Sequence, residues 1–251
     1  MLEMSEGKSR FASAGLWLGG IAAAILVLSI LGNRVELVHF GVAVRGMALA
    51  ALIGIVAAGV SAAGVILTFV TAKTGLRTAI AGLVLGVLVA APVVQAIMVG
   101  AKVPRIHDIT TDLENPPAFE EAVAARGENS NPLDRAAPDL AELQRQAYPD
   151  LVTLEVSEHP GKVFEAAHET AKEMGWQILA ADPARGIIEA TATTAVMNFK
   201  DDVAIRITET TDGAAIDVRS VSRVGESDLG ANANRIRTYL HALKVKLAAT
   251  G

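Results

Sequence analysis

A histidine and two aspartates follow closely on one another in the segment Pro104-Arg-Ile-His-Asp-Ile-Thr-Thr-Asp112. An imidazole beside carboxylates can act as a general base, and the same groups are metal ligands. The spacing of His107, Asp108 and Asp112 matches no metal-binding pattern, however, and the sequence has no His-x-x-x-His pair. We therefore predict no metal and no cofactor, and we expect this segment to be an ordered arm that docks on a sheet.

Charged side chains alternate with apolar ones in segments that are typical of β-strands. Side chains two residues apart in a strand point to the same face of the sheet. The residues that share the polar face are Asp202 and Arg206 on one strand, Asp217, Arg219 and Arg223 on the next, and Glu189, Thr191 and Thr193 on an earlier one. We expect this face to be solvated, with cross-strand ion pairs worth about 0.2–1 kcal/mol each.

The alternative is that Arg206, Arg219 and Arg223 bind an anionic ligand or a lipid head group, since a guanidinium group fits carboxylate and phosphate. The candidate ligand-binding residues are then His107, Asp108, Asp202, Arg206, Asp217, Arg219 and Arg223. A hydrolase-type enzyme that uses His107 with Asp108 or Asp112, and with Asp202 as a further candidate, is a second alternative. The sequence does not decide whether the chain is an enzyme, because it contains neither a glycine-rich phosphate loop nor a nucleophile elbow.

The elements that carry these residues follow the order β-α-β-β-β-β-α. Strands are predicted at 152–156, 176–180, 186–194, 203–207 and 215–223, and helices at 160–174 and about 228–248. Alternating strands joined by tight turns form an antiparallel sheet, and two amphipathic helices cover its apolar face. The predicted fold of this part is therefore an α+β two-layer domain with an order similar to that of helix-grip domains.

Residues 104–150, which we call the arm, precede this domain and contain six prolines: Pro104, Pro116, Pro117, Pro132, Pro138 and Pro149. The composition indicates an extended segment with short helices, at 118–125 and at 138–147, where Pro138 suits the first helical position. The predicted domains are thus a membrane unit at 1–103, the arm at 104–150 and the α+β domain at 151–251.

Three long apolar runs fill the first hundred residues, at 11–32, 47–72 and 78–101. Each run is longer than the roughly 20 residues that a helix needs to cross a bilayer core about 30 Å thick. Backbone groups in lipid must be satisfied within the segment, so the runs predict three transmembrane helices. The first run is too long for the core of a signal peptide and is followed by no A-x-A-like site.

Charge is distributed unevenly along the chain. Before Pro104 there are 7 Lys and Arg against 3 Asp and Glu, whereas from Pro104 onward there are 15 against 24. An acidic domain of this kind argues against a nucleic-acid partner, because binding of nucleic acid depends on neutralising its phosphates. The basic N-terminal tail and the cationic loop between Lys73 and Arg77 favour an N-terminus inside the cell, which puts the soluble domain outside the cytoplasm.

Small residues recur in the apolar runs, with Gly15 and Gly19 in the first and Gly82 and Gly86 in the third. Small residues four apart let helices approach closely. We expect this packing within the three-helix unit, with a homo-oligomer through the same faces as the alternative. The spans contain no ionisable residue, which argues against a transporter or channel.

Three segments of the soluble part are similar to a known family: PRIHDITTDLENPPAF at 104–119, FKDDVAIRI at 199–207 and DVRSVSRVGESDLGANANRIRTYL at 217–240, together with Gly175-Trp176. They resemble the domain of unknown function 1499 family over about residues 104–248. The resemblance implies a bacterial, membrane-anchored protein with no assigned activity and no catalytic residues to carry over.

The leading hypothesis from the sequence is a three-span protein of the bacterial inner membrane that presents an α+β ligand- or partner-binding module in the periplasm. The expected partners are the lipid bilayer and either an envelope protein or an anionic lipid. The hydrolase-type enzyme is the alternative.

Overall fold

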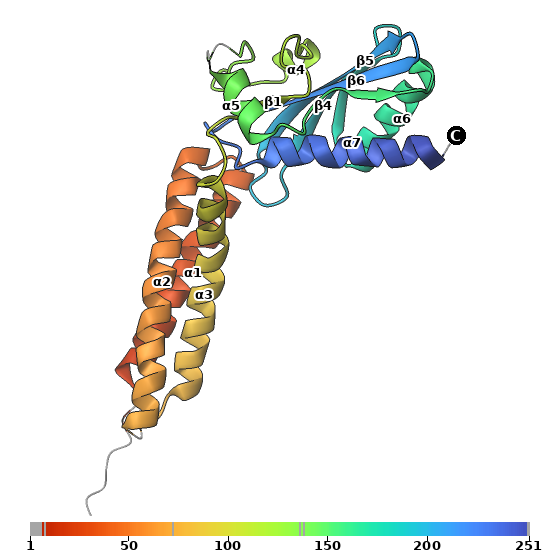
Figure 1. Cartoon of the computed structure of the whole chain (residues 1–251). Coiled ribbons are helices and arrows are strands. Elements are labelled where there is room, and N and C mark those ends of the chain that lie inside the picture. Colours follow the sequence, from red (N-terminus) through yellow and green to blue (C-terminus); the bar gives the residue numbers. More distant parts are fainter. Residues whose placement is uncertain (1–6, 8, 72, 136, 138, 250–251) are drawn as a thin grey trace, which may run out of the picture. The chain divides into compact units, whose positions relative to one another are not determined.

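The computed structural model describes residues 7, 9–71, 73–135, 137 and 139–249 (Figure 1). The chain divides into two compact units, Met1–Val99 and Gly100–Gly251. Three predicted details fall on residues outside those described: Lys8 in the basic tail, Ala72 at the end of the second run, and Pro138 at a helix start.

The first unit consists of three long helices, α1 (Arg10–Arg34), α2 (Phe40–Val70) and α3 (Leu76–Gly100). All three are long and apolar enough to cross a membrane, as the sequence predicted. The second helix begins earlier than the apolar run does, because His39 caps it: the Nδ1 atom of His39 accepts a hydrogen bond from the Gly41 amide at 3.2 Å.

Glycines lie where these helices approach one another most closely. A methyl group at Gly15 of α1 would collide with Ser61 of α2, and one at Gly54 would lie 2.9 Å from the carbonyl oxygen of Gly86 in α3. The predicted small-residue pairs are buried inside the unit, at Gly15 and Gly19 and at Gly82 and Gly86. The expected packing within the three-helix unit is therefore observed, while the homo-oligomer stays a prediction.

The second unit is an α+β domain with a six-stranded antiparallel sheet in the order β1-β6-β5-β4-β3, with β2 also paired to β6. The strands are β1 (Asp108–Thr110), β2 (Leu154–Val156), β3 (Gln177–Asp182), β4 (Ile187–Thr193), β5 (Lys200–Thr210) and β6 (Gly213–Ser222). The α+β class is as predicted, whereas β1 is an additional strand that the sequence did not predict. Three residues are too few to show an alternation of apolar and polar side chains.

Strands β1 and β2 share one edge of β6. Strand β2 pairs with residues 214–216 and β1 with residues 219–221. Between them, the Thr111 amide donates to the Val218 carbonyl at 3.0 Å, and the Thr111 hydroxyl accepts from the Val218 amide at 2.9 Å. Thr111 thus satisfies the backbone groups of β6 that neither short strand reaches.

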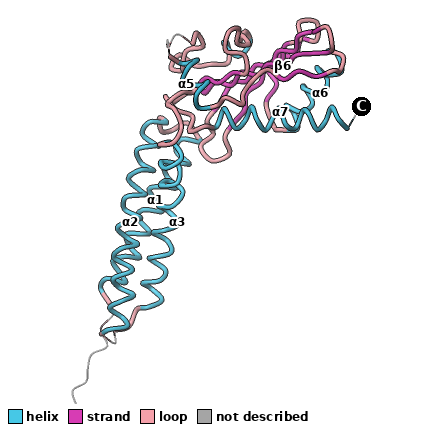
Figure 2. Tube along the Cα trace, in the orientation of Figure 1, coloured by secondary structure: helices cyan, strands magenta, loops and turns pink. Residues whose placement is uncertain are grey.

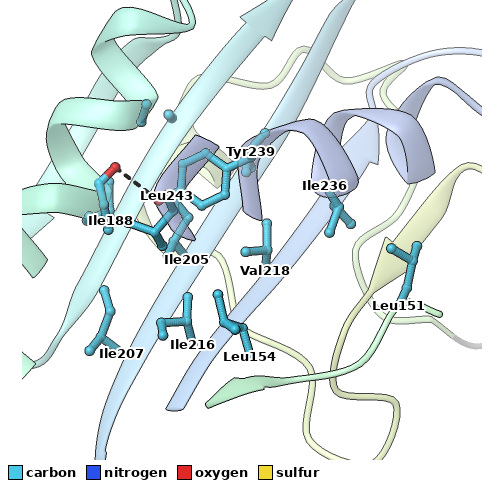
Figure 3. Close-up of a cluster of buried hydrophobic side chains, with 14 of the residues drawn as sticks. Leu151, Leu154, Ile188, Ile205, Ile207, Ile216, Val218, Ile236, Tyr239 and Leu243 are labelled. Atoms are coloured by element: carbon cyan, nitrogen blue, oxygen red, sulfur yellow. Dashed lines mark hydrogen bonds between the residues drawn. The ribbon is translucent and has the colours of Figure 1, made fainter. Parts of the chain in front are cut away.

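Two helices cover one face of the sheet, α6 (Pro160–Glu173) and α7 (Ala231–Ala249). Their apolar sides and the sheet enclose the core, which includes Ile188, Ile205, Ile216 and Val218 (Figure 3). Tyr239 of α7 is fully buried in it and donates from its hydroxyl to the Ala167 carbonyl of α6 at 2.9 Å. This bond links the two helices across the core.

The last helix begins three residues later than predicted. Asp228 caps α7, because its carboxylate accepts hydrogen bonds at 2.8 Å from the amides of Gly230 and Asn232. Leu229, predicted as the first residue of the apolar seam, instead precedes the helix, has a positive φ of 55° and is exposed.

The arm covers the other face of the sheet. It contains β1 and two short helices, α4 (Glu121–Ala124) and α5 (Leu140–Ala147), which Figure 1 shows on the side opposite α6 and α7. Figure 2 shows that most of the remaining arm is loop.

Candidate functional site

The polar face of the sheet is buried, so the expectation of a solvated face was wrong. Asp202 is 0% exposed, Asp217 4% and Arg219 5%. The reason is that β1 pairs along the edge of β6 and leads the arm across the face. The charges that alternate along β4, β5 and β6 therefore meet a second set of charges on the arm, and the two sets form one buried ionic layer.

Three residues form what we call the Asp108 cluster: Asp108 on β1, Arg219 on β6 and Arg135 on the arm. Arg219 binds the carboxylate with two donors, Nε to Oδ1 at 3.0 Å and Nη2 to Oδ2 at 2.7 Å. Arg135 donates from Nη1 to the same Oδ1 at 2.6 Å. Two guanidinium groups thus share one carboxylate.

The two arginines of this cluster differ in how completely they are satisfied. Arg219 also donates to the carbonyl groups of Pro117 at 3.2 Å and Leu133 at 2.6 Å, and its guanidinium lies 5.1 Å from the Phe119 ring centre. The Nη2 atom of Arg135, in contrast, is buried and has no hydrogen-bond partner among the described residues. Burial lowers the pKa of Arg135, and Asp108 opposes that shift.

A cavity of about 470 Å³ adjoins the Asp108 cluster. Its volume lies within the range of small-molecule sites, about 300–1,000 Å³. Its lining combines apolar side chains with both arginines and one exposed carboxylate: Leu113, Pro116, Ala118, Leu133, Asp134, Arg135, Ala137, Leu140, Ala141 and Arg219. We call it the arm pocket.

One aspartate and two arginines also meet at a second point of the layer, which we call the Asp202 cluster: Asp202 on β5, Arg223 just after β6, and Arg126 on the arm. Arg223 donates to the Asp202 carboxylate from Nε and Nη2, the latter at 2.7 Å, and Arg126 of the arm donates from Nη1 at 2.6 Å. The Thr191 hydroxyl completes the site at 2.9 Å. The remaining guanidinium donors reach arm carbonyls: Arg126 reaches Asn131 at 2.6 Å and Arg223 reaches Ala125 at 2.7 Å.

At Arg206 the ratio of arginines to carboxylates is reversed. Its Nη2 atom donates to two carboxylates, Asp112 at 2.9 Å and Asp217 at 2.8 Å. Asp217 also accepts from the hydroxyls of Thr111 and Thr153. Although partial burial raises the pKa of Asp112, hydrogen bonds from the amides of Asn115 and Glu114 and from Arg206 leave it below the ordinary value. Asp112 is thus held in its charged form.

Glu189 joins the sheet to the first arm helix. Its carboxylate accepts from the amides of Glu120 at 2.9 Å, Glu121 at 3.2 Å and Ala122 at 2.8 Å. These amides are at the start of α4, where backbone donors have no partner within the helix. The opposing residue on β5 is Ala204, which itself opposes Arg219 on β6, so a small side chain separates two large charged ones.

His107 lies apart from these clusters. Its backbone carbonyl accepts from the Ser222 amide and from Asn232 Nδ2, both at 3.0 Å, and Asn232 belongs to α7 on the opposite side of the sheet. On that side Arg235 binds Asp201 and Asn232. Within the described part of the chain, no group of His, Asp and Glu side chains is arranged to hold a metal ion.

The structure thus brings six of the seven predicted ligand residues into one layer: Asp108, Asp202, Arg206, Asp217, Arg219 and Arg223. Sequence reasoning missed Arg126 and Arg135, which lie in loop segments of the arm without any periodicity. The three segments that carry the family resemblance meet here, since 104–119 supplies Asp108, 199–207 supplies Asp202, and 217–240 supplies Arg219.

Comparisons with known proteins identify the family of the soluble part. The sequence model of a family described as "Protein of unknown function (DUF1499)" matches residues 108–243. Among solved structures, the chain is similar to the X-ray crystal structure of protein MLL2253 from Mesorhizobium loti, at 15% identity and a TM-score of 0.33. That match covers 40% of this chain and 96% of the other. No curated protein matches the chain.

Proposed function

Because the chain belongs to the DUF1499 family of proteins of unknown function, we propose its role from the geometry: a membrane-anchored module that binds an oxyanion-bearing ligand in the arm pocket. The ligand class is a carboxylate or a phosphate. The cellular location that we propose with it is the bacterial inner membrane, with the module in the periplasm.

The charge balance of the Asp108 cluster supports an anionic ligand. Two guanidinium groups meet one carboxylate there, as in the Asp202 cluster, but here both arginines also line a pocket. An anion that enters the arm pocket therefore meets two cationic side chains, one of which has an unsatisfied donor. Asp134 also lines the pocket, but it is exposed and water screens its charge.

The buried Nη2 atom of Arg135 is the single observation on which the proposal rests. Leaving a buried donor unsatisfied costs about 1–3 kcal/mol, and more for a charged group. Arg135 lines the pocket, so we expect an oxyanion that enters to supply the missing acceptor once the side chain turns its Nη2 atom toward the pocket. A guanidinium group binds carboxylate and phosphate with more than one N–H donor, which gives such a contact direction as well as strength.

The test uses the full-length chain in phosphatidylcholine nanodiscs at constant ionic strength. Acetate and inorganic phosphate are the probes, acetamide is the neutral control, and hydrogen–deuterium exchange of residues 113–141 is the measurement. We expect acetate or phosphate, but not acetamide, to slow the exchange of this segment. Constant ionic strength separates this effect from general screening.

Two variants make the test specific. Arg135→Gln removes the unsatisfied donor but leaves Asp108 with Arg219, so it is expected to fold and to lose the protection. Arg145→Gln, on α5 of the same arm, removes an exposed arginine that does not line the arm pocket and should respond like the wild type. Protection by neither anion, or equal protection in the Arg135→Gln variant, would refute the proposal.

The hydrolase alternative requires the carboxylate of Asp108 or Asp112 to work with His107. Asp108 is bound by Arg135 and Arg219, and Asp112 by Arg206 and two backbone amides. These contacts favour a role for both carboxylates in holding the arm on the sheet, and the enzyme stays a prediction.

A further inference from the structure

The third membrane helix carries a shallow, open apolar groove on its surface. The groove has a volume of about 440 Å³ and is lined within the first half of α3 by Arg77, Ile80, Ala81, Val84, Leu85 and Leu88. The spacing of these residues is that of one face of a helix. Ala81, the smallest of them, makes room between larger neighbours, and a single cation stands at the beginning of the groove.

We propose that this groove holds one acyl chain of an anionic phospholipid, with the phosphate of that lipid bound at Arg77. The length fits: at a rise of about 1.5 Å per residue, the distance along α3 from Arg77 to Leu88 is roughly 16 Å. That is about half of a bilayer core roughly 30 Å thick, which is the depth of one leaflet.

The charge at the end of the groove selects the head group. Arg77 and Lys73 are exposed, and residues 71–77, which join α2 to α3 and begin α3, contain these two cations and no carboxylate. In the described part of the chain, neither residue forms an ion pair. A basic residue at the membrane surface attracts anionic lipid by about 1 kcal/mol.

The charges also favour a lipid over a second copy of the chain. Val84 and Leu88 are exposed, so the face could pack against another helix. Two copies packed symmetrically on this face would bring their Arg77 side chains near each other without a counter-charge, which opposes association. A phospholipid instead supplies an acyl chain and a negative charge in the same molecule.

Native mass spectrometry of the full-length chain tests the proposal. The protein is released from nanodiscs of mixed phosphatidylglycerol and phosphatidylethanolamine, and retained lipids are identified by mass. We expect one phosphatidylglycerol per chain. Arg77→Gln should lower the retained ratio of phosphatidylglycerol to phosphatidylethanolamine about fivefold, the factor that corresponds to about 1 kcal/mol.

Two further variants separate charge from shape. Arg45→Gln removes an exposed arginine of α2 that does not line the groove and should retain phosphatidylglycerol normally. Ala81→Leu fills the groove while keeping Arg77, so it should lower retention of both lipids. Equal loss in the Arg77→Gln and Arg45→Gln variants would overturn the proposal. So would a wild-type dimer without bound lipid that Ala81→Leu dissociates, because a second copy would then cover the groove.

Discussion

The Asp108 and Asp202 clusters have the same composition, but they differ in how completely their guanidinium donors are satisfied. Each consists of one aspartate from the sheet, one arginine from β6 or its C-terminal end, and one arginine from the arm. The arginines of both clusters also donate to arm carbonyls, but in the Asp108 cluster the Nη2 atom of Arg135 has no partner among the described residues. We infer that the first serves stability and that the second keeps a donor for a ligand.

Asp202→Asn should have the largest effect on stability. The change leaves Arg126 and Arg223 buried without their carboxylate, and breaking a buried ion pair typically costs about 3–5 kcal/mol. Urea unfolding followed by Trp176 fluorescence measures it, in a Trp17→Phe background that removes the only other tryptophan. A loss of less than about 1 kcal/mol in the free energy of unfolding would contradict the stabilising role of the Asp202 cluster.

Asp108→Asn should destabilise the domain less than Asp202→Asn does. Arg219 keeps its two carbonyl acceptors, and Arg135 lines a pocket that admits water. The same unfolding measurement in added phosphate sharpens the comparison. Phosphate should restore part of the stability of Asp108→Asn and none of that of Asp202→Asn, and equal rescue of both would remove the distinction.

Arg126→Gln and Arg135→Gln should separate the two clusters with one type of substitution. Arg126→Gln removes bonds to Asp202 and to the Asn131 carbonyl, so we expect a loss of about 1–3 kcal/mol. Arg135→Gln removes bonds to the Asp108 carboxylate and carbonyl, but it also removes an unsatisfied buried donor, so its effect on the free energy of unfolding should be smaller than that of Arg126→Gln. The reverse order of the two variants in the unfolding experiment would show that the clusters were assigned the wrong way round.

The smallest effect concerns pH. The lowered pKa of Asp112 means that its tie to Arg206 stabilises the folded state fully above the ordinary carboxyl pKa. This contribution is lost as the pH falls through the lowered value in the folded state. Hydrogen exchange of residues 111–117 should therefore accelerate as the pH falls below about 4, the ordinary carboxyl pKa, by more than the intrinsic pH dependence of exchange predicts. Asp112→Asn should abolish that additional acceleration, and an unchanged profile in this variant would exclude Asp112 as its cause.

The sequence predicted the elements well where a long pattern exists. The length of the apolar runs was sufficient to predict α1 to α3. The alternation from Val203 to Ile207 was sufficient to predict β5 and which of its side chains share a face. Alternation reports which side chains share a face, but it contains no information on what covers that face. A solvated face and a face buried by an arm with opposite charges therefore produce the same pattern.

The candidate site was predicted on the side of the sheet and, on the arm, at Asp108 and Asp112, but without the two arm arginines. Asp202, Arg206 and Arg219 could be found because strand period places them together. Arg126 and Arg135 lie in loops, where position depends on long-range contacts such as the bond from Arg135 to Asp108. His107 and Asp108 are adjacent in sequence, yet the backbone of His107 is bonded to Ser222 and Asn232 while Asp108 faces the arm.

The shared edge of β6 has a consequence for how the arm can move. Residues 111–153 form a closed loop, because β1 fixes one end and β2 fixes the other on the same strand. Loop-closure entropy grows only slowly with length, so a segment of this size can be tied at both ends at modest cost. Loss of one ion pair should then open the arm locally, and the fixed ends return it to the same register when the pair forms again.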